Sequence, residues 1–302
     1  MAEPTHPPRI AGAPISWGVC EVPGWGRVLD ARTVLAEMAA LGLTALELGP
    51  PGYLPADPAE LRALLDEFGL RALGGFLAVP LHREPEQAHA AVRRTAELFA
   101  ATGAEVLVLA AATGLEGYDS RPTLTGAEWQ TLIETAAAAR DIAAEHGLRT
   151  VVHPHVGTQI EAEAEVERFL ADSDLDLCLD TGHMLIGGTD PLGLVRRHPG
   201  RIGHIHLKDV RADLAGEIRR GTLEYSQAVR RGLYVPLGEG DVDIAALVRG
   251  LRESGYRGWY VIEQDTALAA TGPADQPRRD TEHSLRHLAG IAAAPGGNLV
   301  GK

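Results

Sequence analysis

Short apolar runs alternate with longer segments of helical periodicity along most of the chain. Runs of about four to eight residues bounded by turn residues are typical of strands buried on both faces, as in a parallel sheet. We predict such strands at residues 10–17, 43–48, 70–79, 105–111, 148–155, 175–180 and 202–208, with an eighth around Val261.

The segments between these runs carry helix start signals. Asp57 precedes Pro58 at the first helical position and Glu60 three residues on, and Thr125 precedes Glu128 with the same spacing. Such patterns are typical of capped helix N-termini. Strands that alternate with helices imply right-handed crossovers and a parallel sheet, and eight such units imply closure into a barrel. We therefore predict an α/β fold, a single-domain (β/α)8 TIM barrel.

One segment interrupts this alternation. The predicted barrel occupies residues 9–292, between short tails at 1–8 and 293–302, and the interruption lies at about 210–240. Apolar residues recur there at helical spacing among charges, which predicts one or two small extra helices. These helices either cap the barrel mouth as a lid or form a surface insertion, and the sequence leaves both readings open.

Composition and net charge exclude several classes of protein. The chain has 302 residues, 45% of them hydrophobic, enough for one large core. Lys and Arg number 28 against 41 Asp and Glu, a formal net charge of −13, whereas a nucleic-acid partner requires a cationic surface. Two cysteines are too few for a disulfide framework, and no signal peptide or membrane-spanning run is recognisable. We expect a cytoplasmic enzyme without a nucleic-acid or membrane partner.

Polar side chains follow several predicted strands at the point where each strand ends. They are His153 and His155, then Asp180 and His183, then His204, His206, Lys208 and Asp209, and finally Glu263 and Asp265. The C-terminal strand ends of such a barrel meet at one face, where its chemistry is placed. Taken singly, Asp180 could cap a turn and a histidine could be a core residue.

The coincidence of so many ligand types favours a metal. Burying these groups together without a counter-ion would cost on the order of several kcal/mol each. A mixed nitrogen and oxygen site suits Mn²⁺, Co²⁺, Zn²⁺ or Fe²⁺. We therefore predict a divalent metal at the strand ends.

The order of the motifs resembles a known superfamily. LDTGH, HIHLKD and VIEQD, with HPH before them, are similar to the xylose isomerase-like TIM barrels, which include sugar isomerases, epimerases and dehydratases. Within that superfamily, APISWGVCEVPGWG, ALELGPPGYLP, VVHPHVGT, LDTGHMLIGGTDP and YVPLGEGDVDI resemble the inosose (2-keto-myo-inositol) dehydratases of inositol catabolism. The resemblance extends roughly over residues 10–265.

The resemblance implies a divalent metal, Mn²⁺ or Co²⁺, held by an Asp, a His and Glu residues. Asp180, His206 and Glu263 stand at those positions. The sugar epimerases carry a Glu ligand on strand five, where this chain has His153. The fourth ligand is therefore His153, our first choice, or Glu161 in the next segment.

The implied reaction is the dehydration of a cyclic keto-polyol such as 2-keto-myo-inositol (scyllo-inosose). It begins with removal of the proton next to the carbonyl; a metal stabilises the resulting enediolate, and positioned side chains take and return protons. We assign the base to His155 or Glu263, and the acid or oxyanion partner to Lys208 or His183.

Two further residues and several alternatives complete the prediction. Trp17 and Glu47, at the ends of strands one and two, are expected to face the polyol. Alternatively, Trp17 packs at the rim of the barrel and Glu47 pairs with an Arg. The closest competing function is a metal-dependent ketose 3-epimerase or sugar isomerase, which reprotonates the same intermediate elsewhere. An abasic-site endonuclease requires more zinc ligands and a basic face, and a barrel without catalysis would have lost ligands. The sequence leaves a homo-oligomer open.

Overall fold

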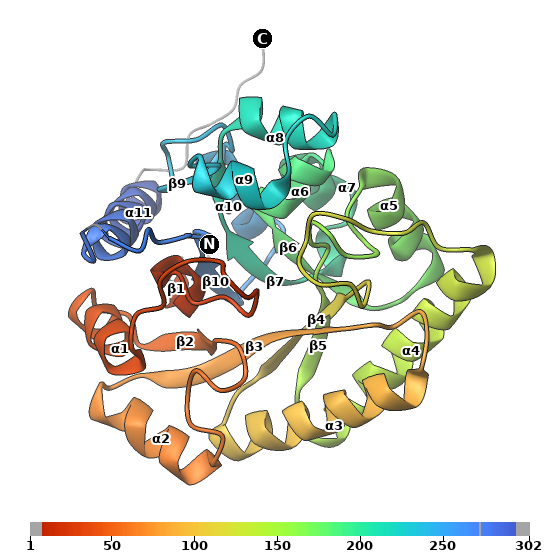
Figure 1. Ribbon diagram of the computed structural model, residues 1–302, viewed down its shortest axis with the longest axis horizontal. Coiled ribbons are helices and arrows are strands. Elements are labelled where there is room, and N and C mark those ends of the chain that lie inside the picture. Colours follow the sequence, from red (N-terminus) through yellow and green to blue (C-terminus); the bar gives the residue numbers. More distant parts are fainter. Residues whose placement is uncertain (1–7, 272, 294–302) are drawn as a thin grey trace, which may run out of the picture.

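The computed structural model describes residues 8–271 and 273–293 of the chain. Within them, eight parallel strands close into a barrel in the order β1, β10, β7, β6, β5, β4, β3, β2 (Figure 1). These strands are β1 (Arg9–Gly12), β2 (Ala45–Leu48), β3 (Arg71–Val79), β4 (Val106–Ala111), β5 (Arg149–Val152), β6 (Asp176–Asp180), β7 (Ile202–Leu207) and β10 (Trp259–Ile262). The predicted single-domain (β/α)8 barrel is confirmed. The two predicted tails lie, apart from residues 8 and 293, outside the described residues.

Helices connect the strands and surround them (Figure 1). They are α1 (Ala31–Ala40), α2 (Pro58–Glu67), α3 (Pro85–Thr102), α4 (Gly126–Glu145), α5 (Glu163–Asp172), α6 (Thr181–Gly187), α7 (Pro191–Arg197), α10 (Ile244–Glu253) and α11 (Gln276–Ala293), with 3-10 turns η1 (Pro14–Trp17) and η2 (Pro199–Arg201). The predicted caps are confirmed. Asp57 accepts hydrogen bonds from the N–H groups of Ala59 and Glu60, both at 2.9 Å. Thr125 and Glu128 cap each other's backbone N–H groups.

Two predicted strands end earlier than expected. β1 ends before η1 (Pro14–Trp17), and β5 ends before the HPH motif at 153–155. Pro14 and Pro154 have no N–H group with which to continue a ladder. The N–H group of His153 still donates to the carbonyl oxygen of Leu109 on β4 at 2.8 Å, whereas that of His155 donates to Ile160 in the following loop at 3.0 Å.

The segment that interrupts the alternation contains two short helices. It comprises β8 (Asp209–Val210), α8 (Ala212–Arg219), α9 (Tyr225–Arg230) and β9 (Tyr234–Val235). β8 and β9 pair antiparallel, and α8 lies beside α6 (Figure 1). Leu214, Leu223 and Tyr225 pack in one apolar cluster with Trp25 and Ile186. The segment therefore packs against the barrel and its N-terminal loop.

Asp209 anchors the chain that returns from this segment. Its carboxylate is fully buried and accepts four backbone N–H bonds, from Val210 at 3.0 Å, Gly238 at 2.8 Å, Gly240 at 3.1 Å and Val242 at 3.0 Å. The sequence placed Asp209 among the chemical groups at the strand ends, but it does not line the cavity found there. Its contacts are those of a structural residue.

We expect Asp209→Asn to lower the free energy of unfolding by about 2–4 kcal/mol. The amide nitrogen of Asn would face backbone N–H donors, which leaves buried donors without an acceptor. Urea unfolding followed by circular dichroism measures the change. Asp66→Asn, at an exposed position in α2, is the matched control. An equal effect of both substitutions would contradict the anchoring role.

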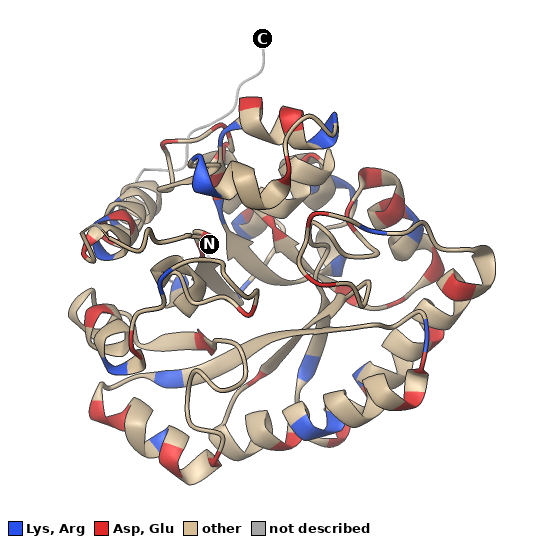
Figure 2. Cartoon of the chain, in the orientation of Figure 1, with Lys and Arg blue, Asp and Glu red and all other residues tan. Residues whose placement is uncertain are grey.

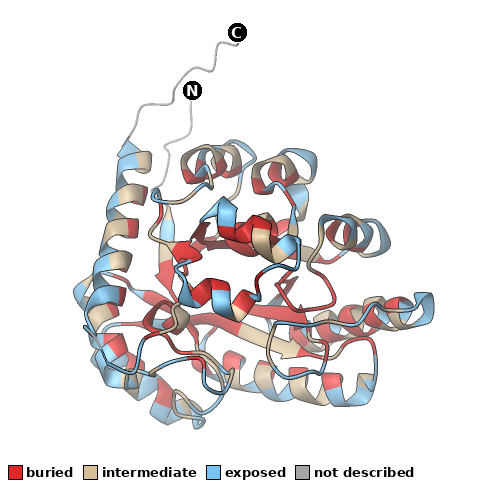
Figure 3. Cartoon of the chain, turned by 45° about the horizontal axis from the view of Figure 1, so that its top comes forward, coloured by how far each residue is buried: buried red, intermediate tan, exposed pale blue. Residues whose placement is uncertain are grey.

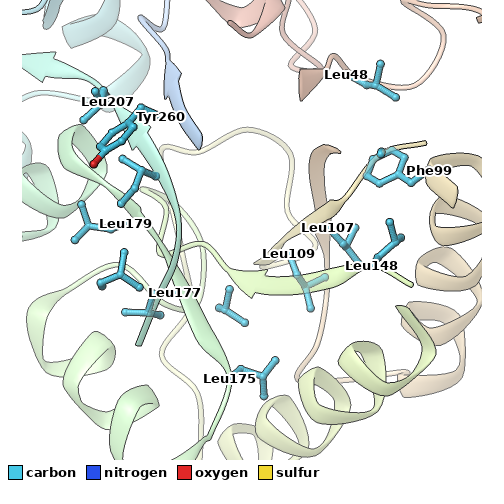
Figure 4. Close-up of a cluster of buried hydrophobic side chains, with 14 of the residues drawn as sticks. Leu48, Phe99, Leu107, Leu109, Leu148, Leu175, Leu177, Leu179, Leu207 and Tyr260 are labelled. Carbon is cyan, nitrogen blue, oxygen red and sulfur yellow. The ribbon is translucent and has the colours of Figure 1, made fainter. Parts of the chain in front are cut away.

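Alternation along the strands sorts side chains into two layers. Leucines on β4, β6 and β7 point outward, towards the helices (Figure 4); they are Leu107, Leu109, Leu177, Leu179 and Leu207. Residues between them on β6 and β7 point into the barrel and form the cross-strand pairs Cys178 with His204 and Asp180 with His206. The same alternation that packs the outer core therefore directs these polar groups inward.

Charged side chains lie mainly on the surrounding helices and loops (Figure 2), whereas the barrel strands are buried (Figure 3). In the described part of the chain, every helix is too short or too polar to cross a membrane.

Candidate active site

A cavity of about 350 Å³ opens at the C-terminal ends of the strands. Its polar wall is formed by Glu47, His153, His155, His206, Lys208, Glu263 and Asp265. Aromatic side chains also line it: Phe76 from β3, Phe99 from α3, Trp25 from the N-terminal loop, Tyr118 from the loop after β4, and Tyr225 from α9. Both the barrel and the inserted segment therefore shape the cavity.

Three of the predicted metal ligands, Asp180, His206 and Glu263, have donor atoms within 4.8 Å of one another, and the fourth, His153, lies beside Asp180. His206 Nδ1 lies 3.6 Å from Asp180 Oδ2 and 3.2 Å from Glu263 Oε2, and His153 Nε2 lies 3.5 Å from the same Asp180 oxygen. Two donors at roughly 2.1 Å from one ion are about 3.0–3.4 Å apart when the angle between them is roughly 90–110°. The observed separations are close to this range, so Asp180, His206 and Glu263 could hold a common divalent ion, with His153 adjacent to Asp180.

The other ring nitrogen of each histidine fixes its tautomer. His206 Nε2 lies 3.0 Å from Glu47 Oε1; a carboxylate only accepts, so Nε2 carries a proton, and in the neutral ring the lone pair of Nδ1 faces Asp180. His153 Nδ1 lies 2.8 Å from the carbonyl oxygen of Pro154, which leaves the lone pair on Nε2. Metal-binding histidines typically have such a partner on the opposite nitrogen.

Unpaired atoms and local charge both favour a cation at this point. Asp180 Oδ2 and His206 Nδ1 are buried without a hydrogen-bond partner, although buried polar atoms are nearly always paired. Burial opposes a charge on His206, yet Glu263 and Glu47 raise the pKa of this imidazole well above its usual value. The surroundings thus favour a positive charge, which a divalent ion would supply. The residues fit a metal.

Lys208 adds a second positive charge. Its Nζ lies 3.2 Å from Asp180 Oδ2, 3.1 Å from Glu263 Oε2 and 2.8 Å from Asp265 Oδ1. Burial alone would lower the pKa of Lys208, but these carboxylates raise it well above its usual value, so the amine is protonated. In return, Lys208 helps to hold the pKa of Asp180 well below its usual value in spite of burial.

His155 and His183 form a stacked pair beside Lys208. Their ring centroids are 3.7 Å apart. Burial, together with neighbouring positive groups, lowers the pKa of both imidazoles well below the usual value, so both are neutral. His155 Nδ1 lies 2.7 Å from the carbonyl oxygen of Val156, which leaves its Nε2 as a free base. His155 lines the cavity, whereas His183 lies behind it, with Nε2 3.0 Å from Lys208 Nζ.

The two residues predicted to face a polyol are placed differently from each other. Glu47 lines the cavity, but it is only 2% exposed and its Oε1 accepts from His204 at 2.7 Å as well as from His206. Trp17 is fully buried in the outer core, and its Nε1 donates to Glu37 Oε2 at 2.7 Å. The structure thus brings Glu47 to the cavity but not Trp17, whose position matches the rim-packing alternative.

Two tyrosines that line the cavity, Tyr118 and Tyr225, were not identified from the sequence. Tyr225 donates to Asp265 Oδ2 at 2.7 Å, and its oxygen lies 3.0 Å from that of Tyr234. Tyr118 lies over His155 with ring centroids 4.6 Å apart. Tyr118 lies in a glycine-containing loop, and Tyr225 lies within a helical pattern. These patterns carry no signal that a particular side chain reaches a site.

Comparison with known proteins agrees with this geometry. The family described as xylose isomerase-like TIM barrel matches residues 35–291. The chain belongs to this family. An inosose dehydratase of Geobacillus kaustophilus (strain HTA426) is 34% identical over 97% of this chain and 99% of its own length. A rhizopine catabolism protein of Rhizobium meliloti is 32% identical over 96% of this chain and 90% of its own length. The predicted resemblance to the inosose dehydratases is confirmed.

Solved structures of other proteins share the fold. A D-psicose 3-epimerase of Clostridium cellulolyticum H10 superposes with a TM-score of 0.71 at 15% identity, covering 95% of this chain and all of its own (100%). A probable 3-DHS dehydratase of Bacillus anthracis superposes with a TM-score of 0.67 at 16% identity, covering 93% of this chain and 98% of its own. At such identities the likeness extends to the barrel alone.

Proposed function

We propose that this protein is a metal-dependent hydro-lyase that removes water from a cyclic keto-polyol such as 2-keto-myo-inositol (scyllo-inosose). One observation carries the proposal: the converging donors Asp180, His206 and Glu263, with His153 beside Asp180, adjoin a cavity that also exposes a neutral imidazole and an ammonium. The relatives named inosose dehydratase support the same reaction. We propose Mn²⁺ or Co²⁺ as the ion.

Individual residues of the site then have separate roles in the reaction. When bound, the divalent ion supplies Lewis-acid stabilisation of negative charge on the substrate oxygen. His155 Nε2, free of other partners, takes the proton next to the carbonyl. The Lys208 ammonium gives a proton to the hydroxyl group at the next carbon, whose C–O bond breaks as the C=C bond forms. Water leaves, and transfer of the proton from His155 to Lys208 restores the starting state without an oxidant or reductant.

Glu263 and His183 support the metal site and the Lys208 ammonium. Glu263 Oε2 lies between His206 Nδ1 at 3.2 Å and Lys208 Nζ at 3.1 Å, so its charge serves both the metal and the ammonium. His183 contacts Lys208 from behind and positions the amine. Tyr118 and Tyr225 would enclose the ring of the substrate from the open side.

The test is a coupled measurement on the purified protein. Stripping with a chelator and adding back Mn²⁺ or Co²⁺ should restore loss of one water from 2-keto-myo-inositol, followed by ultraviolet absorbance and mass. Metal-dependent epimerisation or isomerisation of a ketose panel, with no change of mass, would instead establish the competing function. Turnover that is unaffected by the chelator would contradict the proposed requirement for a metal.

His153→Ala tests the fourth ligand. We expect Mn²⁺ affinity to fall about 10–100-fold, the range found when a supporting group of a metal site is removed. Metal titration of the stripped protein measures it, and His146→Ala, at the end of α4, is the control. The alternative ligand Glu161 is paired with Arg121 at 3.1 Å. Unchanged affinity in His153→Ala would therefore assign the fourth position to water.

A further inference from the structure

Lys208 separates two groups of metal-binding side chains. Asp180, His206 and Glu263 form the first, which the proposed function assigns to the divalent ion. His155, His183 and Asp265 form the second, and their donor atoms also lie within 4.8 Å of one another. All six side chains are buried. On side-chain chemistry alone, the cavity could hold two divalent ions.

The ammonium of Lys208 lies where the second ion would bind. Its Nζ is 2.8 Å from Asp265 Oδ1 and 3.0 Å from His183 Nε2, two donors of the second group. It also approaches Asp180 and Glu263 of the first group, at 3.2 Å and 3.1 Å. One cation thus touches donors of both groups.

These contacts are ion pairs between buried groups. Asp265 Oδ1 and Asp180 Oδ2 lie within ion-pair distance of Nζ, yet neither has a hydrogen-bond partner of acceptable geometry. Asp265 is only 6% exposed, so solvent does not supply the missing donor. A buried oxygen in this state is one that a cation can occupy.

Charge balance points the same way. The three carboxylates in contact with Lys208, those of Asp180, Glu263 and Asp265, carry three negative charges. One divalent ion and one ammonium neutralise them. A second divalent ion beside the ammonium would leave about two positive charges in excess, whereas two divalent ions without the ammonium would leave about one; the larger buried excess is the more costly in a low-dielectric site.

We propose that the Lys208 ammonium takes the second cation position and limits this centre to one divalent ion. The inference rests on the metal of the proposed function. This role of Lys208 would explain why a site with two sets of metal-binding side chains holds a single divalent ion. Unlike a metal ion, this second cation stays when the protein is treated with a chelator and also carries a transferable proton.

The experiment counts Mn²⁺ per chain after stripping and reloading the full-length protein with excess Mn²⁺. Elemental analysis should find one ion in the native protein and two in Lys208→Met, which removes the charge and keeps the length of the side chain. Electron paramagnetic resonance should detect coupling between two nearby Mn²⁺ ions in the variant alone. The double substitution Lys208→Met with Asp265→Asn, which also removes a donor of the second group, should return the count to one.

The outcomes separate the two proposals. One ion in both the native protein and Lys208→Met, or two in the native protein, would contradict the role proposed for Lys208. Either result would still agree with the proposed metal dependence. No bound Mn²⁺ in the native protein would contradict the metal site of the proposed function. If Lys208→Met does not fold, Lys208→Gln replaces it with the same expected count.

Discussion

Glu263→Gln should reduce kcat by at least about 10³-fold while the protein still folds. The amide has nearly the same shape as the carboxylate but no charge, so it neither balances the proposed ion nor holds the ammonium of Lys208 at 3.1 Å. Loss of one charged contact of this kind in a buried site typically costs about 10²–10³ in rate, and here two contacts are lost. Steady-state kinetics on the metal-loaded protein measure the effect.

The control for this variant is Glu105→Gln. Glu105 pairs with Arg71 at 2.8 Å at the opposite, N-terminal end of the barrel, and is half exposed. It should leave kcat unchanged. Thermal unfolding of both variants should remain cooperative. If Glu263→Gln retains activity within about tenfold of the native protein, Glu263 does not hold the role assigned to it.

His155→Gln should reduce kcat by about 10²–10⁴-fold, the range expected for loss of a general base. Gln can keep the hydrogen bond to the carbonyl of Val156 but cannot accept the substrate proton. Exchange of the substrate proton next to the carbonyl with deuterated solvent, followed by mass, should fall by the same factor. Mn²⁺ affinity should stay within a few-fold, because the ion is assigned to other residues.

His283→Gln is the matched control for the base. This histidine lies on α11, is 40% exposed, and pairs with Glu239 outside the lining of the cavity. Its substitution should change neither turnover nor exchange. Normal exchange in His155→Gln together with lost turnover would show that another group takes the proton, and Glu263 would then be the remaining candidate.

Much of the site was predictable because it depends on local chain geometry. Apolar runs define the strands, and the period of two along β6 and β7 directs Asp180 and His206 into the barrel while Leu179 and Leu207 face the helices. Parallel strands of a closed barrel bring their C-terminal ends together. Spacing alone therefore indicated that these donors would meet.

Other parts depend on contacts between distant segments and were not predictable in this way. Whether Trp17 faces a substrate or the core depends on how η1 packs on α1, where Glu37 accepts its N–H. Tyr225 reaches Asp265 only because α9 folds back across the cavity, 40 positions earlier in the chain. Helical periodicity states which residues share a face, but not what that face meets.

The sequence by itself determined the barrel, the alternation that places polar groups at its mouth, and the set of side chains able to bind a metal. Only the tertiary structure decided their protonation and their pairing. The Glu47 carboxylate fixes the tautomer of His206, and the Lys208 ammonium lies among three carboxylates from two strand ends. Such interactions act over distances of a few ångströms between residues far apart in the chain, so they exist only once the barrel has closed.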